Sequence, residues 1–333
     1  MIKKIILLTV ILNLSIIFFS CLKTNTNNQK NLNSITYTDS TNEISPIKDT
    51  AEKSKDFKGL EHKIANTRIF GNTISCLNQE GLIYVENNVL IYSNDNGDLI
   101  YRTKEIQETL IKEANAKYIN FINDTIYYIN SKNNNAYSYN LSDKTTEIIY
   151  SDINSLIATS DFIVYKDINN NLYIQNQNEN ELISKNIVLW TEFYDEYIIF
   201  TELKNDCCIK AYNINTKETI ELLEYGLSPF VYEDDLYYQN KDGYIYTLNL
   251  PTGKNILIYE DWGQQFCILN DELYYLSSKG ICCEGNIINS STDLSQIERI
   301  FICNNNLYFL EQKDGISNIY FFDAYTKKEE LIK

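Results

Sequence analysis

Histidine, which many hydrolytic and metal sites require, occurs once in this chain of 333 residues. The residue, His62, falls in a polar stretch near the amino terminus. The usual Ser-His-Asp and Cys-His catalytic sets and His-based zinc or iron sites are therefore excluded. No phosphate-cradling glycine loop or dinucleotide fingerprint occurs either. The sequence predicts no catalytic residue, no resident metal and no cofactor, and we expect His62 itself to be solvated.

Positive charge is also scarce. Lys and Arg number 29 against 45 Asp and Glu, which gives a formal net charge of −16. Removal of the export signal described below would leave 27 basic and 45 acidic residues, a net charge of −18. This balance argues against nucleic acid and against an anionic membrane surface as partners. It favours a soluble, monomeric domain at a cell surface.

Paired cysteines and metal-binding cysteine motifs are lacking as well. Neither Cys207-Cys208 nor Cys282-Cys283 has the CxxC spacing of a metal site. If Cys21 is lipidated, seven of the eight cysteines remain, so at least one thiol has no partner within the chain. We expect thiols that stay reduced, and the sequence alone assigns no disulfide.

The amino terminus has the order of an export signal. Lys3 and Lys4 precede the uncharged run Ile5–Phe19, whose 15 residues are short for a membrane-spanning helix, which needs about 17–25 residues. The run ends in Phe18-Phe19-Ser20-Cys21, which resembles the lipobox of bacterial lipoproteins. We predict that residues 1–20 are a lipoprotein signal peptide. Lipidated Cys21 would then hold the protein on the outer face of the bacterial cell membrane. An ordinary signal peptide or an anchor helix with an incidental cysteine are the alternatives.

Residues 21–66 are rich in Asn, Thr, Ser and Lys and poor in apolar residues. Such a composition predicts a disordered tether. A flexible coil of this length would reach roughly 35–40 Å.

Tyrosine, in contrast, is abundant, with 27 residues. One aromatic residue ends the second strand-sized segment of each repeat, at Tyr92, Tyr128, Tyr165, Phe200, Tyr238, Tyr275 and Phe309. The intervals are 36, 37, 35, 38, 37 and 34 residues. A period in this range with β composition predicts propeller blades or a β-solenoid.

Each repeat contains four strand-sized segments, as propeller blades do. In the stretch 234–261, turn residues separate Leu236–Tyr238, Tyr244–Leu248 and Asn255–Tyr259. We predict an all-β chain in which residues 67–333 form a β-propeller of four-stranded blades. Seven repeats are counted, and six or eight blades remain open. Tyrosine would fill the space between neighbouring blades.

A polar pair precedes each second strand and predicts a tight hairpin turn. The pairs are Asn87-Asn88, Asn123-Asp124, Ser160-Asp161, Asp195-Glu196, Asp234-Asp235, Asp271-Glu272 and Asn305-Asn306. The acidic members could attract a cationic partner or could be simply a solvated face. Their recurrence favours turn chemistry over a glycosidase dyad. The segment Asp167–Asn171 resembles a calcium loop but lacks its glycine and closing glutamate, so a hairpin turn is preferred there.

The turns of a four-stranded meander divide between two faces of a ring. The links between blades share one face with the turns between second and third strands. Tyr225-Gly226 and Trp262-Gly263 occupy equivalent places in adjacent links. Aromatic residues on loops suit stacking on a sugar or peptide, so we predict that Tyr225 and Trp262 bind a ligand. Covering of the blade ends is the alternative, and Trp190, within an innermost strand, is assigned to the core.

The segment Arg68–Ser93 contains Gly71-Asn72-Thr73, Asn78-Gln79-Glu80-Gly81 and Val89–Ser93, and a second unit reads Tyr118–Asn120 and Ile126–Tyr128. These motifs resemble a bacterial surface β-propeller family of unknown function, itself similar to the YWTD-type propeller of low-density-lipoprotein-receptor-related proteins. The resemblance covers about Asn66–Lys333 and implies the propeller fold, often with six blades. The resemblance assigns no functional residue of that family to a position in this sequence.

Two classes of function remain. The first is a surface-anchored, non-enzymatic module that binds an extracellular protein, peptide or carbohydrate. The second is a propeller-type carbohydrate-active enzyme that uses carboxylates and tyrosine, and an envelope-assembly scaffold is a further alternative. An enzyme should place two or more carboxylates and a tyrosine around one pocket, whereas a binding module should show aromatic and scattered polar groups. We also expect Arg68–Leu77 or Gly81–Glu86 to close the ring against the last blade, because open sheet edges are costly.

Overall fold

The structure is a computed structural model that describes residues 57–60, 68–176, 179–203, 206–288, 297–313, 316–323, 326 and 328–332. The predicted signal peptide, Cys21, His62 and the predicted tether apart from residues 57–60 lie outside these residues. The chain divides into two units, Met1–Ile47 and Lys48–Lys333, and the second is the one described here. Within the described part, no helix is long and apolar enough to cross a membrane.

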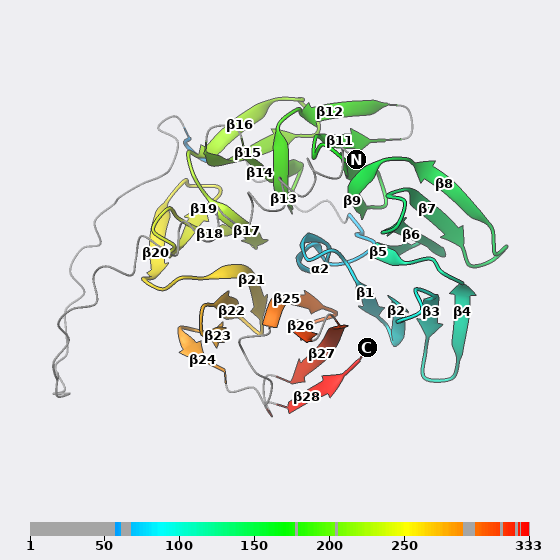
Figure 1. Cartoon of the computed structure of the whole chain (residues 1–333). Coiled ribbons are helices and arrows are strands. Elements are labelled where there is room, and N and C mark those ends of the chain that lie inside the picture. Colours follow the sequence, from blue (N-terminus) through cyan, green and yellow to red (C-terminus); the bar gives the residue numbers. More distant parts are fainter. Residues whose placement is uncertain are drawn as a thin grey trace, which may run out of the picture. The chain divides into compact units, whose positions relative to one another are not determined.

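Seven antiparallel sheets, each of four consecutive strands, form a β-propeller (Figure 1). The prediction of an all-β propeller with seven repeats is confirmed, and the alternatives of six or eight blades are removed. Blades 1 to 4 are β1 (Ile83–Glu86), β2 (Val89–Ser93), β3 (Leu99–Arg102), β4 (Gln107–Ile111); β5 (Ala116–Ile122), β6 (Thr125–Asn130), β7 (Ala136–Asn140), β8 (Thr146–Tyr150); β9 (Ile153–Ala158), β10 (Ile163–Asp167), β11 (Leu172–Gln175), β12 (Asn180–Ser184); and β13 (Ile187–Tyr194), β14 (Tyr197–Leu203), β15 (Cys207–Asn213), β16 (Thr219–Leu223). Blades 5 to 7 are β17 (Leu227–Tyr232), β18 (Asp235–Gln239), β19 (Ile245–Asn249), β20 (Asn255–Tyr259); β21 (Gln264–Leu269), β22 (Glu272–Ser277), β23 (Gly280–Cys283), β24 (Asn286–Ile287); and β25 (Ile297–Cys303), β26 (Asn306–Lys313), β27 (Ile316–Asp323), β28 (Lys328–Leu331).

The periodic aromatic residues all lie on second strands, where they build the packing within each blade. In blade 5, Tyr238 is 1% exposed and stacks on its cross-strand neighbour Tyr246, with 5.8 Å between ring centroids. Its hydroxyl exchanges hydrogen bonds with the Asn255 amide of the fourth strand, and Nδ2 of Asn255 donates at 2.8 Å. Blade 3 repeats the arrangement, since Tyr165 stacks on Tyr173 at 5.0 Å. Tyrosine therefore supplies a large buried ring and a hydroxyl that finds a partner at the blade edge.

The hairpin turns follow the predicted chemistry. Both residues of the turn have positive φ at Asn87-Asn88 and at Asn123-Asp124, as two-residue type I′ hairpins require. Three pairs were predicted one residue too late in the chain. Strand pairing places these turns at Glu233-Asp234, Asn270-Asp271 and Asn304-Asn305.

The two faces of the ring carry different connections. We call the face with the first–second and third–fourth turns the hairpin face, and the face with the second–third turns and inter-blade links the link face. Residues 57–60, placed by the sequence in the tether, pack on the hairpin face between blades 4 and 5. Phe57 and Leu60 are buried with Tyr194, Leu236 and Leu250, and the Leu60 N–H donates to the Leu250 carbonyl at 2.7 Å. Residues 57–60 therefore contact the ring on its hairpin face.

The channel of the ring is filled by the chain itself. The short helix α2 (Ile74–Asn78) lies at the centre of the ring in Figure 1. The segment that contains it forms hydrogen bonds with several inner strands. Asn72 Nδ2 donates to the carbonyls of Ile83 and Ile119, at 2.8 and 2.7 Å. Thr73 Oγ1 donates to the Ile302 carbonyl, and Ser75 Oγ accepts the Ile302 N–H at 3.1 Å.

Blades 1 and 7 meet through side chains rather than through a shared strand. Each sheet is built from consecutive strands, so no blade mixes the two ends of the described chain. Cys76 of α2 and Ile83 of β1 are buried against Phe301 and Cys303 of β25. Both segments that we expected to close the ring therefore contact the last blade, without forming a β-ladder with it.

Candidate functional site

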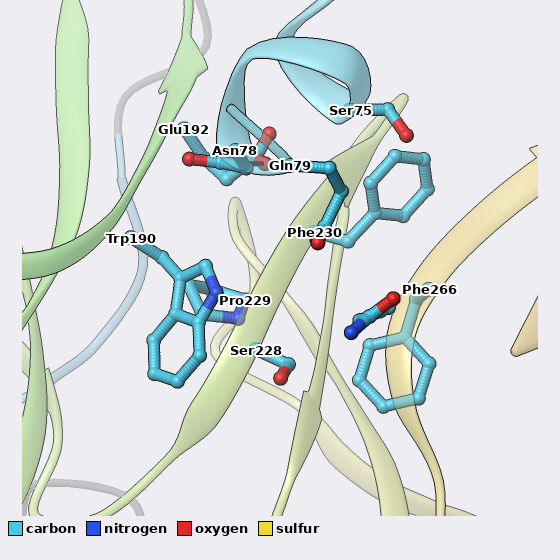
Figure 2. Close-up of a pocket in the computed structure, with 10 residues that line it drawn as sticks. Ser75, Asn78, Gln79, Trp190, Glu192, Ser228, Pro229, Phe230 and Phe266 are labelled. Atoms are coloured by element: carbon cyan, nitrogen blue, oxygen red, sulfur yellow. Dashed lines mark hydrogen bonds between the residues drawn. The ribbon is translucent and has the colours of Figure 1, made fainter. Parts of the chain in front are cut away.

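A small pocket lies where the channel ends beneath α2. It is lined by Ser75, Asn78, Gln79, Trp190, Glu192, Ser228, Pro229, Phe230, Gln265 and Phe266, from α2 and the turn after it and from β13, β17 and β21 (Figure 2). In this view Trp190 and Phe266 lie on opposite sides of Ser228. The lining residues Ser228, Pro229, Gln265 and Phe266 lie in the first halves of β17 and β21, next to the inter-blade links of the link face. Its empty volume is about 260 Å³, counted out to the solvent.

Backbone irregularities shape this pocket. The pairing of each inner strand with its neighbour shifts register at the residues that line it: after Val188 in β13, after Leu227 in β17 and after Gln264 in β21. Ser228 and Gln265 have φ values of 51° and 57°, which are unusual for residues other than glycine. A bulge turns a side chain away from the regular alternation and is common beside binding sites. Here the bulges place Trp190, Ser228, Gln265 and their neighbours on the wall of the pocket.

Glu192 is the one carboxylate of the pocket. It is 4% exposed, and its Oε1 accepts a hydrogen bond from Asn78 Nδ2 at 2.7 Å. A longer contact of 3.5 Å joins its Oε2 to the Val231 N–H of the next blade. Burial raises the pKa of the Glu192 carboxyl to about 8, and the hydrogen bonds from Val231 and Asn78 offset part of that rise. The group is therefore poised to take up or release a proton near neutral pH.

Asn78 holds the end of α2 against the bulged strand β13. Its Nδ2 also donates to the Thr191 carbonyl at 2.9 Å, and its Oδ1 accepts the Thr191 N–H at 3.2 Å. The amide therefore satisfies both backbone groups of Thr191, which lies just after the bulge on an innermost strand that has a ladder partner on one side only. This clamp positions Glu192, the next residue, at the base of the pocket.

The two predicted ligand-binding residues lie elsewhere on the link face, and they flank one turn. Lys241 in the β18–β19 turn lies over the Tyr225 ring, with Nζ 5.3 Å from its centroid. Trp262 packs on Gly243 of the same turn, where an added Cβ would come within 2.7 Å of the indole Cδ1. Trp262 is still 37% exposed and Tyr225 is half-buried. We call Tyr225, Lys241 and Trp262 the turn patch; a ligand on it stays a prediction.

The glycines after these aromatic residues allow close packing rather than a sharp turn. Neither Gly226 nor Gly263 has a positive φ, so neither makes a sharp turn that only glycine allows. A Cβ at Gly226 would lie 2.5 Å from Ile209 Cδ1, and one at Gly263 would lie 2.6 Å from Ile245 Cδ1. Close packing of the link on the preceding blade therefore requires glycine at both positions.

Trp190 was wrongly assigned to the core. It is half-buried and lines the pocket, because the bulge in β13 turns it toward the channel. Glu192, Asn78, Phe230 and Phe266 were not singled out in the sequence. One available signal was that Glu192 is the only charged residue in the eight-residue strand IVLWTEFY.

The other chemical candidates have structural partners. The Tyr194 and Tyr232 hydroxyls donate to Asp234 and Asp271 in the turns of the following blades, at 2.8 and 2.9 Å. These acidic turn residues therefore join neighbouring blades as well as forming turns. Asp167 Oδ1 accepts the N–H groups of Asn169 and Asn171, as in an ordinary hairpin turn.

The cysteines of the described residues carry free thiols at positions 76, 207, 208, 267, 282, 283 and 303. In the same part of the chain, no group of three or more His, Cys, Asp and Glu side chains could hold a metal ion.

No family model and no curated protein matches this sequence. Solved structures match it at low identity. The computationally designed Ika8 protein aligns over 83% of this chain and 89% of its own, with 11% identity and a TM-score of 0.52. Hsv2 of Kluyveromyces lactis, with loop 6CD replaced by a Gly-Ser linker, aligns over 80% and 98%, with 12% identity and a TM-score of 0.51.

A puromycin-hydrolyzing peptidase of Mycobacterium tuberculosis aligns over 80% of this chain but only 56% of its own, with 9% identity and a TM-score of 0.53. At such identities a likeness shows the fold alone. The chain is similar to these proteins in being a β-propeller, and its own propeller has seven blades.

Proposed function

We propose that this protein is a surface-anchored lipoprotein whose propeller binds an extracellular protein, peptide or carbohydrate without chemical conversion. The observation that carries the proposal is the make-up of the channel pocket. It contains three aromatic rings, scattered hydroxyl and amide groups and one carboxylate, Glu192, and no tyrosine. A glycosidase-type site would need two carboxylates across one substrate. Aromatic walls with a few convergent polar groups are typical of binding pockets.

The division of the ring into two faces supports the same proposal. Residues 57–60 contact the hairpin face, whereas the link face carries the pocket and the turn patch. A lipid at Cys21 would therefore anchor the protein through its hairpin face and leave the link face for a partner.

Replacement of an aromatic residue of the turn patch tests the proposed binding face. With the partner identified by crosslinking on intact cells, Tyr225→Ala and Trp262→Ala should each weaken its binding by about 2 kcal/mol, or roughly 30-fold. The reason is that an exposed ring can supply a large share of a modest affinity. Isothermal titration of each purified variant measures the effect.

Melting curves of the same variants supply the control. Trp262 also covers Gly243, so a small loss of stability is expected from Trp262→Ala. Unchanged affinity in both variants, together with lower melting temperatures, would show that the two rings only cover the blade ends.

Cys21→Ala should release the protein from the membrane. The basic, apolar, small-residue, cysteine order at the amino terminus predicts that this thiol carries the lipid. Metabolic labelling with an alkynyl palmitate analogue, followed by membrane fractionation, measures the anchor. Label that persists in Cys21→Ala would contradict the lipidation of this residue, and Cys208→Ala is a matched control that should keep the label.

A further inference from the structure

We propose that the channel pocket binds a primary ammonium group, with Glu192 as its counter-ion and the rings of Trp190, Phe230 and Phe266 as its walls. This inference rests on the proposed function, because it names the chemical class that one site on the link face would recognise. The ammonium can belong to a free alkylamine or to a lysine side chain, and the experiment below separates these sources.

The first argument is the isolation of Glu192. Among the residues of α2, β13, β17 and β21, which surround the pocket, it is the only charged one. A buried carboxylate without a cation is costly, and the two hydrogen bonds from neutral donors compensate for only part of that cost. Ionisation of Glu192 is therefore unfavourable in the empty pocket, and a bound cation would stabilise the carboxylate.

The surrounding titratable groups do not supply that cation. Those on the elements packed around Glu192 are Cys76, Lys166, Tyr194, Tyr197, Glu202, Tyr232, Cys267, Glu298, Arg299 and Cys303. Two of them are cations. Arg299 donates to the Gln79 carbonyl at 3.2 Å and pairs with Glu80 at 3.0 Å, and the Nζ of Lys166 donates to the Leu189 carbonyl at 2.8 Å. Glu202, on β14, pairs with Lys210. Neither pair provides a counter-charge to Glu192.

The second argument is the nature of the walls. Aromatic faces attract cations, and this attraction offsets part of the free energy that a cation loses when it is dehydrated. Among the aromatic side chains, Trp attracts cations most strongly. Three rings line the pocket beside one carboxylate, which is the combination that holds alkylammonium groups. Hydroxyl and amide oxygens of Ser75, Gln79 and Ser228 also line it. They are potential acceptors for the remaining N–H groups of an ammonium, which has three donors.

The third argument is size. The empty volume of about 260 Å³ includes the open end of the pocket. The enclosed part of the pocket has room for a group about the size of one water molecule. This pocket fits one narrow group at the end of a chain better than a sugar ring. The formal charge of −16 adds a long-range attraction for basic partners.

Binding would exchange a proton for the ammonium. In the empty pocket the Glu192 carboxyl holds its proton up to a pKa of about 8. When R–NH₃⁺ enters, the carboxyl releases one proton to solvent and the carboxylate forms an ion pair with the ammonium. No covalent bond to carbon or nitrogen changes. The affinity should therefore rise with pH up to about 8, and well below this pH one proton should be released for each amine bound.

The test is isothermal titration of the purified protein with n-butylammonium chloride at pH 8 and pH 6. We expect saturable binding at pH 8 that is weaker at pH 6 by a factor on the order of 50. Titration in two buffers of different ionisation enthalpy should show the release of close to one proton per amine at pH 6 and of about half a proton at pH 8. The neutral analogue n-butanol should bind at least tenfold more weakly, and Glu192→Gln should abolish the ammonium binding.

Glu260→Gln is the matched control, since Glu260 is an exposed carboxylate in the link before Trp262 and does not line the pocket. This variant should bind butylammonium as the unmodified protein does. Spermidine and a lysine-containing pentapeptide with its norleucine counterpart then separate the two sources. Tighter binding of spermidine would identify a free amine as the natural group. Tighter binding of the lysine-containing pentapeptide would identify a protein side chain.

Absence of saturable butylammonium binding, equal binding by Glu192→Gln, or equal binding of butanol would each overturn the inference. None of these outcomes would contradict the proposed function as a binding module. A partner whose binding depends on Tyr225 and Trp262 would still support a binding module, even if the channel pocket takes no amine.

Discussion

Glu192→Gln is expected to raise the melting temperature at pH 8 and to flatten its dependence on pH. The folded-state pKa of this carboxyl is raised by burial from an ordinary value of 4.5 to about 8. The folded protein therefore holds more protons than the unfolded chain between these values. The stabilisation is fully present below pH 4.5 and is lost as the pH rises through 8, by up to about 1.4 kcal/mol per pH unit.

Glutamine keeps the shape of the side chain and an oxygen that accepts the bond from Asn78, but it carries no charge. One of the two hydrogen bonds to this side chain is lost in the variant. We expect it to be the weaker one, the 3.5 Å contact with the Val231 N–H. We expect a net gain of about 2 kcal/mol at pH 8, or about 4–8 °C. Near pH 5 the gain should vanish, because the glutamic acid is then already neutral in the folded protein.

Thermal unfolding between pH 5 and pH 8 measures this effect. The range stops at pH 8 because burial lowers the pKa of Lys166 to about 8, so deprotonation of that lysine adds stability above this pH. Glu260→Gln is again the control and should leave the slope unchanged. A lower melting temperature for Glu192→Gln at pH 8, or an unaltered slope, would show that Glu192 is not a strained carboxylate.

Removal of residues 68–78 should destabilise the propeller more than any single substitution. The deletion takes away α2, in which Cys76 and Leu77 are each 1% exposed. It also leaves the N–H and carbonyl groups of Thr191 and Ile302 without their partners on the helix segment. Each such buried group costs about 1–3 kcal/mol. We expect a loss of at least about 5 kcal/mol, which corresponds to a decrease of about 10–20 °C in melting temperature.

A single substitution tests the same role if the deletion variant does not fold. Asn72→Ala removes the Nδ2 bonds to Ile83 and Ile119, which join blades 1 and 2 to the channel segment. We expect a cost of about 2–3 kcal/mol. Circular dichroism melts of this variant and of the exposed-turn control Asn215→Ala measure the difference. Equal melting curves for Asn72→Ala, Asn215→Ala and the unmodified protein would contradict a structural role for the channel segment.

The repeat was readable from the sequence because its causes are local. Tyr238 and its six equivalents mark the second strands, and each ring needs only its own blade and the next for burial. Turn residues act over two to four positions, as Asn87-Asn88 shows by positive φ at both residues. The same locality explains the errors of one residue at three turns. An Asn or Asp on either side of the turn satisfies the pattern equally well, and strand pairing decides between them.

The contents of the channel were decided by the tertiary structure. A helix of five residues has no periodicity to recognise, and its position depends on Asn78 meeting Glu192, 114 residues further along the chain. The bulges at Ser228 and Gln265 occur at residues without a turn signature, because packing around a closed ring imposes them. The sequence by itself therefore determined seven repeats of four strands and two faces, and the structure showed that each repeat is one blade. Only the convergence of four distant elements on one carboxylate created the pocket, since strand and turn propensities do not extend over such separations.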